Sequence, residues 1–234
     1  MRNSPLLLIA LAEILSYRLY PIGFYSDDWH HLFIMRGGFW SFADSPGYWT
    51  RPLQIIQFPA LYWLVGDSPW IGQVILCGLG ILEGWLLFKV LEKLTGNARL
   101  ALTAAILAVI FPIRIATHLW ISNTSQLIAH SMILGSILLS LRGSRIGSSF
   151  AALCSGLTYE SAMFAPLMLL ADKEPRRHWH FIPCLLTVVA WQFLVADNPK
   201  GMELSSTHIV DVYWNGLLAI FMAPLELIKY VLIG

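Results

Sequence analysis

Apolar residues along this chain form long continuous runs that short polar segments separate. A membrane-crossing helix needs about 20 such residues, and runs of this kind recur through the whole sequence. The pattern predicts an all-α, polytopic membrane protein with about seven or eight transmembrane helices in a single domain, residues 1–234. The expected crossings are residues 5–22, 70–94, 98–111, 124–141, 180–196 and 209–233, with one or two more at 147–171.

One stretch, residues 25–66, carries many charged, His and Trp residues between the apolar runs. We expect it to be an external loop that folds as two surface helices. The first begins at Asp27 and ends near Arg36, where two glycines follow. The second begins around Arg51, because proline is favoured in a first helical turn, and ends at Gly66.

The segment 147–171 decides the topology, because it is either one ordinary span or a hairpin of two short helices broken near residues 158–161. Basic residues precede it, such as Arg145, and follow it, such as Lys173, and both groups favour the cytoplasmic side. This distribution favours the hairpin, whose tip then lies within the bilayer and directs Glu160 into a cavity. A single straight span is the alternative.

The basic residues also orient the chain. With the N-terminus in the cytoplasm, ten of the 15 lysines and arginines fall inside, as the positive-inside rule requires. Four of the five external ones are arginines close to the acidic loop or to His118, which suggests an anion site. We therefore expect a multi-pass protein of a bacterial inner membrane, with the loop at 25–66 on the periplasmic or extracellular side.

Composition supports the membrane assignment. The chain is 57% hydrophobic and 12% charged, with a net charge of +1, whereas soluble domains have roughly 25% charged residues. The absence of a basic stripe in the sequence argues against nucleic acid as a partner. Cys77, Cys154 and Cys184 all lie in apolar runs and are interpreted as core thiols.

The external polar residues form a set that can hold a phosphate and remove a proton. Arginine offers a bidentate fork to phosphate, and a carboxylate can act as general base or bind a divalent cation such as Mg²⁺ or Mn²⁺. The alternative is structural, because acids in a first helical turn, headgroup-anchoring arginines and interfacial tryptophans are all common. The set comprises Asp27, Asp28, His31, Arg51, Arg114, His118, Trp120 and Glu160.

Four motifs occur in a fixed order: Ser26-Asp27-Asp28-Trp29, Arg51-Pro52-Leu53, FP-x-R-x₃-H-x-WIS at 111–122, and Tyr-Glu-Ser-x₄-Pro at 159–166. As an ordered set they resemble the membrane half of C-type (GT-C) glycosyltransferases, over residues 1 to about 200. Protein O-mannosyltransferases and lipid-A aminoarabinose transferases are similar in pattern.

The resemblance implies sugar transfer, with inversion, from a polyprenyl-phosphate-linked donor to an acceptor on the non-cytoplasmic face. It also implies site roles. Asp27 or Asp28 is the expected catalytic base or metal ligand, and Arg51, Arg114 or His118 is expected to bind the donor phosphate. His31, Trp120 and Glu160 are expected to line the cavity.

Two other functions stay open. Tyr159 stands where the relatives commonly have Lys, and they continue with further helices where this sequence stops. These departures favour the first alternative, in which the chain is a non-catalytic GT-C-like subunit that acts as a scaffold or lipid-binding wall beside other membrane subunits. Transport is a weaker alternative, because the sequence shows no inverted repeat. Glu13, Glu83 and His130 lie within predicted spans and indicate either helix-packing contacts or a proton pathway.

Overall fold

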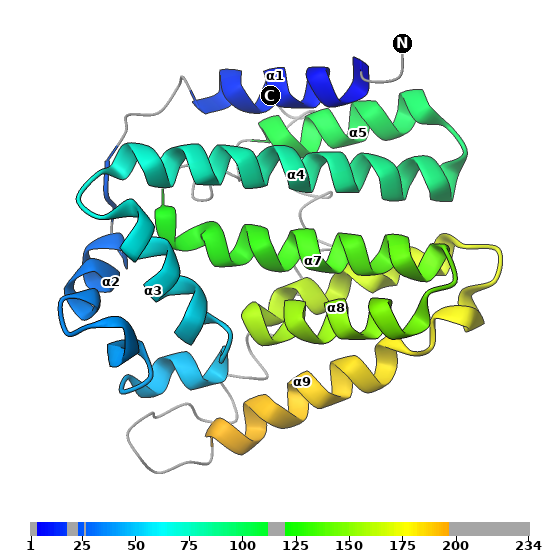
Figure 1. Cartoon of the computed structure of the whole chain (residues 1–234). Coiled ribbons are helices and arrows are strands. Elements are labelled where there is room, and N and C mark those ends of the chain that lie inside the picture. Colours follow the sequence, from blue (N-terminus) through cyan, green and yellow to red (C-terminus); the bar gives the residue numbers. More distant parts are fainter. Residues whose placement is uncertain (1–3, 18–22, 26, 112–119, 197–234) are drawn as a thin grey trace, which may run out of the picture.

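The computed structural model describes residues 4–17, 23–25, 27–111 and 120–196, and every regular element in these ranges is a helix (Figure 1). This confirms the all-α prediction for the described part of the chain. The α-helices are α1 (Ser4–Tyr17), α2 (Asp27–Met35), α3 (Gln54–Val65), α4 (Pro69–Thr95), α5 (Ala98–Ile110), α7 (Thr124–Leu141), α8 (Arg145–Thr158) and α9 (Phe181–Ala196). The 3₁₀ segments are η1 (Phe39–Phe42), η2 (Pro46–Thr50), η4 (Ile121–Asn123), η5 (Glu160–Ala171) and η6 (Pro175–His178).

The long helices stack side by side. α1 packs on α4 and α5, α4 packs on α7, and α7 packs on α8, while α9 lies along the far side of α8 (Figure 1). The segment from α2 to α3 covers one end of this stack. The turns α4–α5 and α7–α8 lie at the opposite end.

Three helical stretches are long and apolar enough to cross a membrane: Pro69–Thr95, Ile121–Leu141 and Pro175–Val195. The expected number of seven or eight spans is therefore not confirmed. α5 has 13 residues and ends at an extended Phe111, which at 1.5 Å per residue gives roughly 20 Å, short of a hydrocarbon core of about 30 Å. The span expected at 209–233 lies outside the described residues.

The segment 147–171 is broken, as the hairpin prediction requires. α8 ends at Thr158, Tyr159 is extended with φ −157° and ψ 110°, and η5 begins at Glu160. η5 packs against both α7 and α8. Soon after its far end, His178 contacts Ser140 at the C-terminus of α7, so η5 runs back toward the turn from which α8 came.

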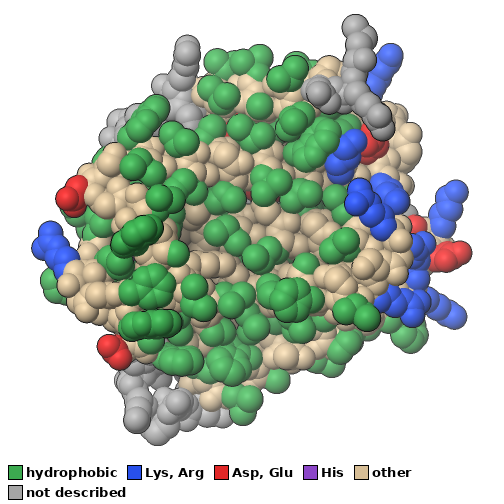
Figure 2. All heavy atoms as spheres, in the orientation of Figure 1, with side chains coloured by type: hydrophobic (Ala, Val, Ile, Leu, Met, Phe, Trp, Pro, Cys, Tyr) green, Lys and Arg blue, Asp and Glu red, His purple; other side chains and the backbone are tan. Residues whose placement is uncertain are grey.

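Most of the described basic residues collect at one end of the stack, where Figure 2 shows a cluster of Lys and Arg side chains at the right edge. They come from the end of α4 and the start of α5, from the α7–α8 turn and the start of α8, and from the segment between η5 and α9. Arg177 fastens the last of these to α7, because its Nη2 donates to the carbonyls of Ser140 (3.4 Å) and Leu141 (3.2 Å). The members are Lys89, Lys93, Arg99, Arg142, Arg145, Lys173, Arg176 and Arg177.

Polar residues inside the stack make helix-packing contacts, as one of the two interpretations expects. Glu83 of α4 and His130 of α7 meet at 3.0 Å between Oε1 and Nδ1. Glu13 of α1 is buried against Gly80 of α4, where the absence of a side chain makes room for the carboxylate.

Gly84 brings α4 close to α1 and α5. A Cβ at this position would lie 2.7 Å from Val109 Cγ2 and 2.9 Å from Ile9 Cγ2, whereas a Cβ at Gly78, on the same helix, would meet nothing within 4 Å. Gly84→Leu should therefore lower the free energy of unfolding by about 1–3 kcal/mol, since overpacking forces buried neighbours to move. Gly78→Leu is the control and should be neutral or slightly stabilising, because leucine is the better helix former.

Thermal unfolding of the two variants in the same detergent measures the difference. Equal melting temperatures for Gly84→Leu and Gly78→Leu would contradict the close packing of α1 on α4.

Candidate functional site

The two adjacent acids at the start of α2 have different environments. Helix geometry separates neighbouring side chains by about 100°, so Asp28 faces inward while Asp27 faces outward. Asp28 is fully buried, with no exposed surface, and Asp27 is exposed. The sequence offered both as equivalent candidates, and the fold separates their roles.

Four donors surround the Asp28 carboxylate. Oδ1 accepts from the hydroxyl of Tyr62 (2.9 Å) and from the backbone N–H of Ser122 (2.7 Å). Oδ2 accepts from the backbone N–H groups of Ile121 (3.1 Å) and Tyr25 (3.0 Å). A buried carboxylate is stable only with such partners, and here it connects α2 to α3 and to η4. Asp28 therefore holds the α2–α3 segment on the helical stack.

His31 lies one turn after Asp28 in an aromatic environment. Its ring stacks on Tyr62 with centroids 5.4 Å apart, and it contacts Phe58 at 4.2 Å and Phe42 at 6.0 Å. Burial lowers the pKa of His31 to about 4. The ring is therefore neutral at pH 7 and cannot supply a positive charge to a phosphate.

Arg51 and Glu160 form a second cluster at the break between α8 and η5. Arg51 Nε donates to Oε2 at 2.8 Å and Nη2 donates to Oε1 at 2.6 Å, a bidentate pair. The guanidinium also lies 4.2 Å from the centre of the Tyr159 ring. Burial alone lowers the pKa of Arg51, but the bonds to Glu160 outweigh it and the pKa is raised.

Two glutamines fasten this break to α3. Gln54 Nε2 donates to the carbonyl of Thr158 (3.0 Å) and to Ser125 Oγ (3.2 Å), and Gln57 Nε2 donates to Thr158 Oγ1 (3.2 Å). These residues were not among the sequence candidates. Their signal was weak but present, since they are polar positions in an otherwise apolar helix.

The two clusters contact different parts of α3. Arg51 precedes the helix and Gln54 begins it, whereas Tyr62 lies eight residues later, about 12 Å along the axis. Asp28 and His31 thus gather around Phe58 and Tyr62 of α3, and Arg51 and Glu160 gather at its start. Both clusters lie at the same end of the stack, although each has its own set of partners.

Three other candidates complete the predicted set. Trp120 is half-buried and immediately precedes η4, where its carbonyl accepts from Asn123 N–H at 3.0 Å. Arg114 and His118 lie outside the described residues.

A divalent metal remains a prediction. Within the described ranges, no group of three or more His, Cys, Asp or Glu side chains is arranged to hold a metal ion. Asp28, one of the two proposed ligands, already directs both oxygens at protein donors.

No family model, curated protein or solved structure matches this chain. The GT-C resemblance therefore stays a prediction that depends on the four sequence motifs.

Proposed function

We propose that the chain transfers a sugar from a polyprenyl-phosphate donor at the end of the stack that carries α2 and α3, with Asp27 as the catalytic base. The observation that carries the proposal is the division of the acidic pair. Asp28 is held by four donors, and it fixes the backbone that presents exposed Asp27 one residue away. A base must be positioned and accessible, and Asp27 meets both requirements.

Arg51 supplies the proposed contact to the donor phosphate. Glu160 engages Nε and Nη2, and we assign Nη1 of the guanidinium to a phosphate oxygen. The side chain of Arg51 is 31% exposed, so a lipid headgroup can reach it. In this arrangement Glu160 is a positioning residue that holds the guanidinium of Arg51 in one orientation.

The proposed orientation places the basic end of the stack in the cytoplasm and the α2–α3 end outside. The positive-inside rule supports this, because both basic turns and the segment before α9 share that end. An external α2–α3 segment then meets the acceptor from the non-cytoplasmic side.

Asp27→Asn should lower the rate of transfer by about 10²–10⁴, the usual contribution of a general base. The measurement is transfer of label from a panel of polyprenyl-phosphate sugars by the purified full-length chain in detergent. Asp44→Asn is the control, because Asp44 is another exposed acid of the same loop and should retain full activity. Undiminished transfer by Asp27→Asn would refute the mechanism.

A second candidate is the non-catalytic membrane subunit. One observation favours it: the carboxylates of Asp28 and Glu160 are both bonded to protein groups, as structural acids are. Its signature is the absence of transfer by the wild-type chain together with fixed stoichiometry in a larger assembly after native purification.

A further inference from the structure

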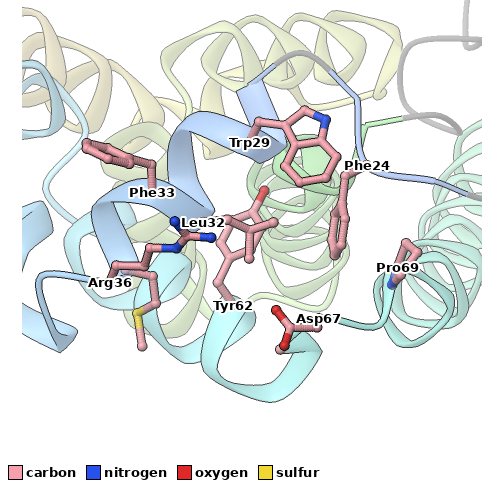
Figure 3. A pocket seen from close by; sticks show the side chains of 10 residues that line it. Phe24, Trp29, Leu32, Phe33, Arg36, Tyr62, Asp67 and Pro69 are labelled. Carbon is pink, nitrogen blue, oxygen red and sulfur yellow. The ribbon is translucent and has the colours of Figure 1, made fainter.

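A cavity of about 620 Å³ opens between α2, the end of α3 and the start of α4. It is separate from the Arg51–Glu160 cluster, and none of the lining residues is one of the proposed transfer residues Asp27, Arg51 and Glu160. Figure 3 shows its walls, which include the aromatic rings of Phe24, Trp29 and Tyr62 and the ring of Pro69. Its surface is more apolar than polar, as expected for a site that takes part of an amphiphile.

Two opposite charges face this cavity. The guanidinium of Arg36, at the end of α2, and the carboxylate of Asp67, before α4, both point into it from different sides (Figure 3). Both residues are exposed, and no ion pair between them is found among the described residues. The cavity therefore offers one strong hydrogen-bond donor group and one strong acceptor group to the same ligand.

Exposed tryptophans are frequent in the segment that forms the cavity. Trp29, Trp40, Trp49, Trp63 and Trp70 have between 44% and 75% of their surface exposed, and all belong to the segment from α2 to the start of α4. Tryptophans gather at the membrane–water interface, because their rings are apolar and their N–H groups are polar. In a bilayer, this belt of tryptophans would put the mouth of the cavity where phosphate and amine groups of lipids are concentrated.

We propose that this cavity binds the headgroup of a zwitterionic glycerophospholipid with a primary ammonium, as in phosphatidylethanolamine. Arg36 binds the phosphate, Asp67 binds the ammonium, and the acyl chains leave over the apolar surface beside Trp29. The charge complementarity selects this class over anionic lipids, because Asp67 repels a headgroup that carries only negative charge. The assignment does not depend on glycosyl transfer.

Lipid titrations of the purified full-length chain test this directly, with bound lipid counted by native mass spectrometry. The probes are dioctanoyl phosphatidylethanolamine, dioctanoyl phosphatidylglycerol and soluble phosphoethanolamine. The wild type should bind the ethanolamine lipid at least tenfold more tightly than the glycerol lipid. Equal affinities would overturn the proposal, and this comparison needs no variant to fold.

Variants separate the two charges. Asp67→Asn should lower the affinity for the ethanolamine lipid about tenfold without lowering the affinity for the glycerol lipid. Arg36→Gln should lower both affinities about tenfold. Asp44→Asn and Arg99→Gln, exposed acid and base away from the cavity, are the controls and should change neither affinity. An unchanged affinity of Asp67→Asn for the ethanolamine lipid would refute the ammonium site. Competition by phosphoethanolamine at the same concentration as the lipid would refute the role of the acyl chains.

Discussion

Asp28→Ala should lower the free energy of unfolding by about 3–5 kcal/mol, because it removes the acceptor of four hydrogen bonds at once. Three of these donors are backbone N–H groups and one is the hydroxyl of Tyr62, and the bonds from Tyr62, Ile121 and Ser122 are buried. Each hydrogen bond to a charged group contributes about 1.5–3 kcal/mol, although such contributions are not additive. The loss of these hydrogen bonds should destabilise the packing of the whole α2–α3 segment on the helical stack.

Asp27→Ala is the matched control, since it changes the same residue type one position earlier. Because Asp27 is exposed, its loss should lower the free energy of unfolding by no more than about 1 kcal/mol, the usual contribution of an exposed acid in a first helical turn. Thermal unfolding in detergent, followed by tryptophan fluorescence, measures both. A melting temperature of Asp28→Ala equal to that of Asp27→Ala would show that the buried carboxylate does not hold the segment in place.

Asp28→Asn refines the test, because it keeps the shape of the side chain. One oxygen becomes an NH₂ group, which cannot accept, so the backbone donor at that position loses its acceptor and faces another N–H group. Most of the loss seen with alanine should therefore persist. Full stability of Asp28→Asn would show that shape, and not hydrogen bonding, fixes this position.

Arg51→Gln should lower the free energy of unfolding by about 3 kcal/mol, since it leaves the Glu160 carboxylate without its cation. The side chain of Glu160 is only 7% exposed, whereas that of Arg51 is 31% exposed. Glu160→Gln should therefore have the smaller effect, about 1–2 kcal/mol, because the remaining guanidinium can reach water. This asymmetry follows from the geometry of the pair.

The double variant Arg51→Gln/Glu160→Gln should be more stable than the sum of the two single changes predicts, with a coupling of about 1–2 kcal/mol. The pair Lys89–Glu92 is the control, because both its side chains are more than a third exposed and it lies within α4 at i,i+3 spacing. Glu92→Gln should change the free energy of unfolding by less than about 0.5 kcal/mol. Additive effects at Arg51 and Glu160 would contradict a direct ion pair across the α8–η5 break.

Local signals in the sequence predicted the boundaries of several elements. α2 begins at Asp27, α3 ends before Gly66, and α4 ends at Thr95, one residue beyond the expected position 94, where Gly96 adopts the left-handed region with φ 68°. These features depend on residues within one or two turns, through caps, turns and the conformational freedom of glycine. The break near Tyr159 was predicted from the placement of basic residues on both sides of it, and the extended backbone at Tyr159 confirms it.

Sequence patterns could not separate the roles of Asp27 and Asp28. The two acids have the same charge and adjacent positions, and their difference arises from partners at residues 121 and 122, more than 90 positions away. Tyr62 gave no signal for the same reason, since an aromatic residue in an apolar helix is indistinguishable from ordinary core. The expected number of spans is likewise not confirmed among the described residues, because hydropathy measures apolar content, while the length of a continuous helix depends on where the backbone breaks.

The sequence by itself determined that the chain is helical and rich in apolar runs, that one segment is polar and aromatic, and that basic residues collect in particular turns. Only the tertiary structure decided that Asp28 is a buried anchor, that Arg51 pairs with Glu160, and that Arg36 and Asp67 face one cavity. Helices and caps are set by neighbouring residues, whose interactions the sequence pattern records directly. Pairings between distant segments depend on how helices pack, and many sequences of the same pattern pack differently, so the chemistry of the site emerges only when the chain has folded.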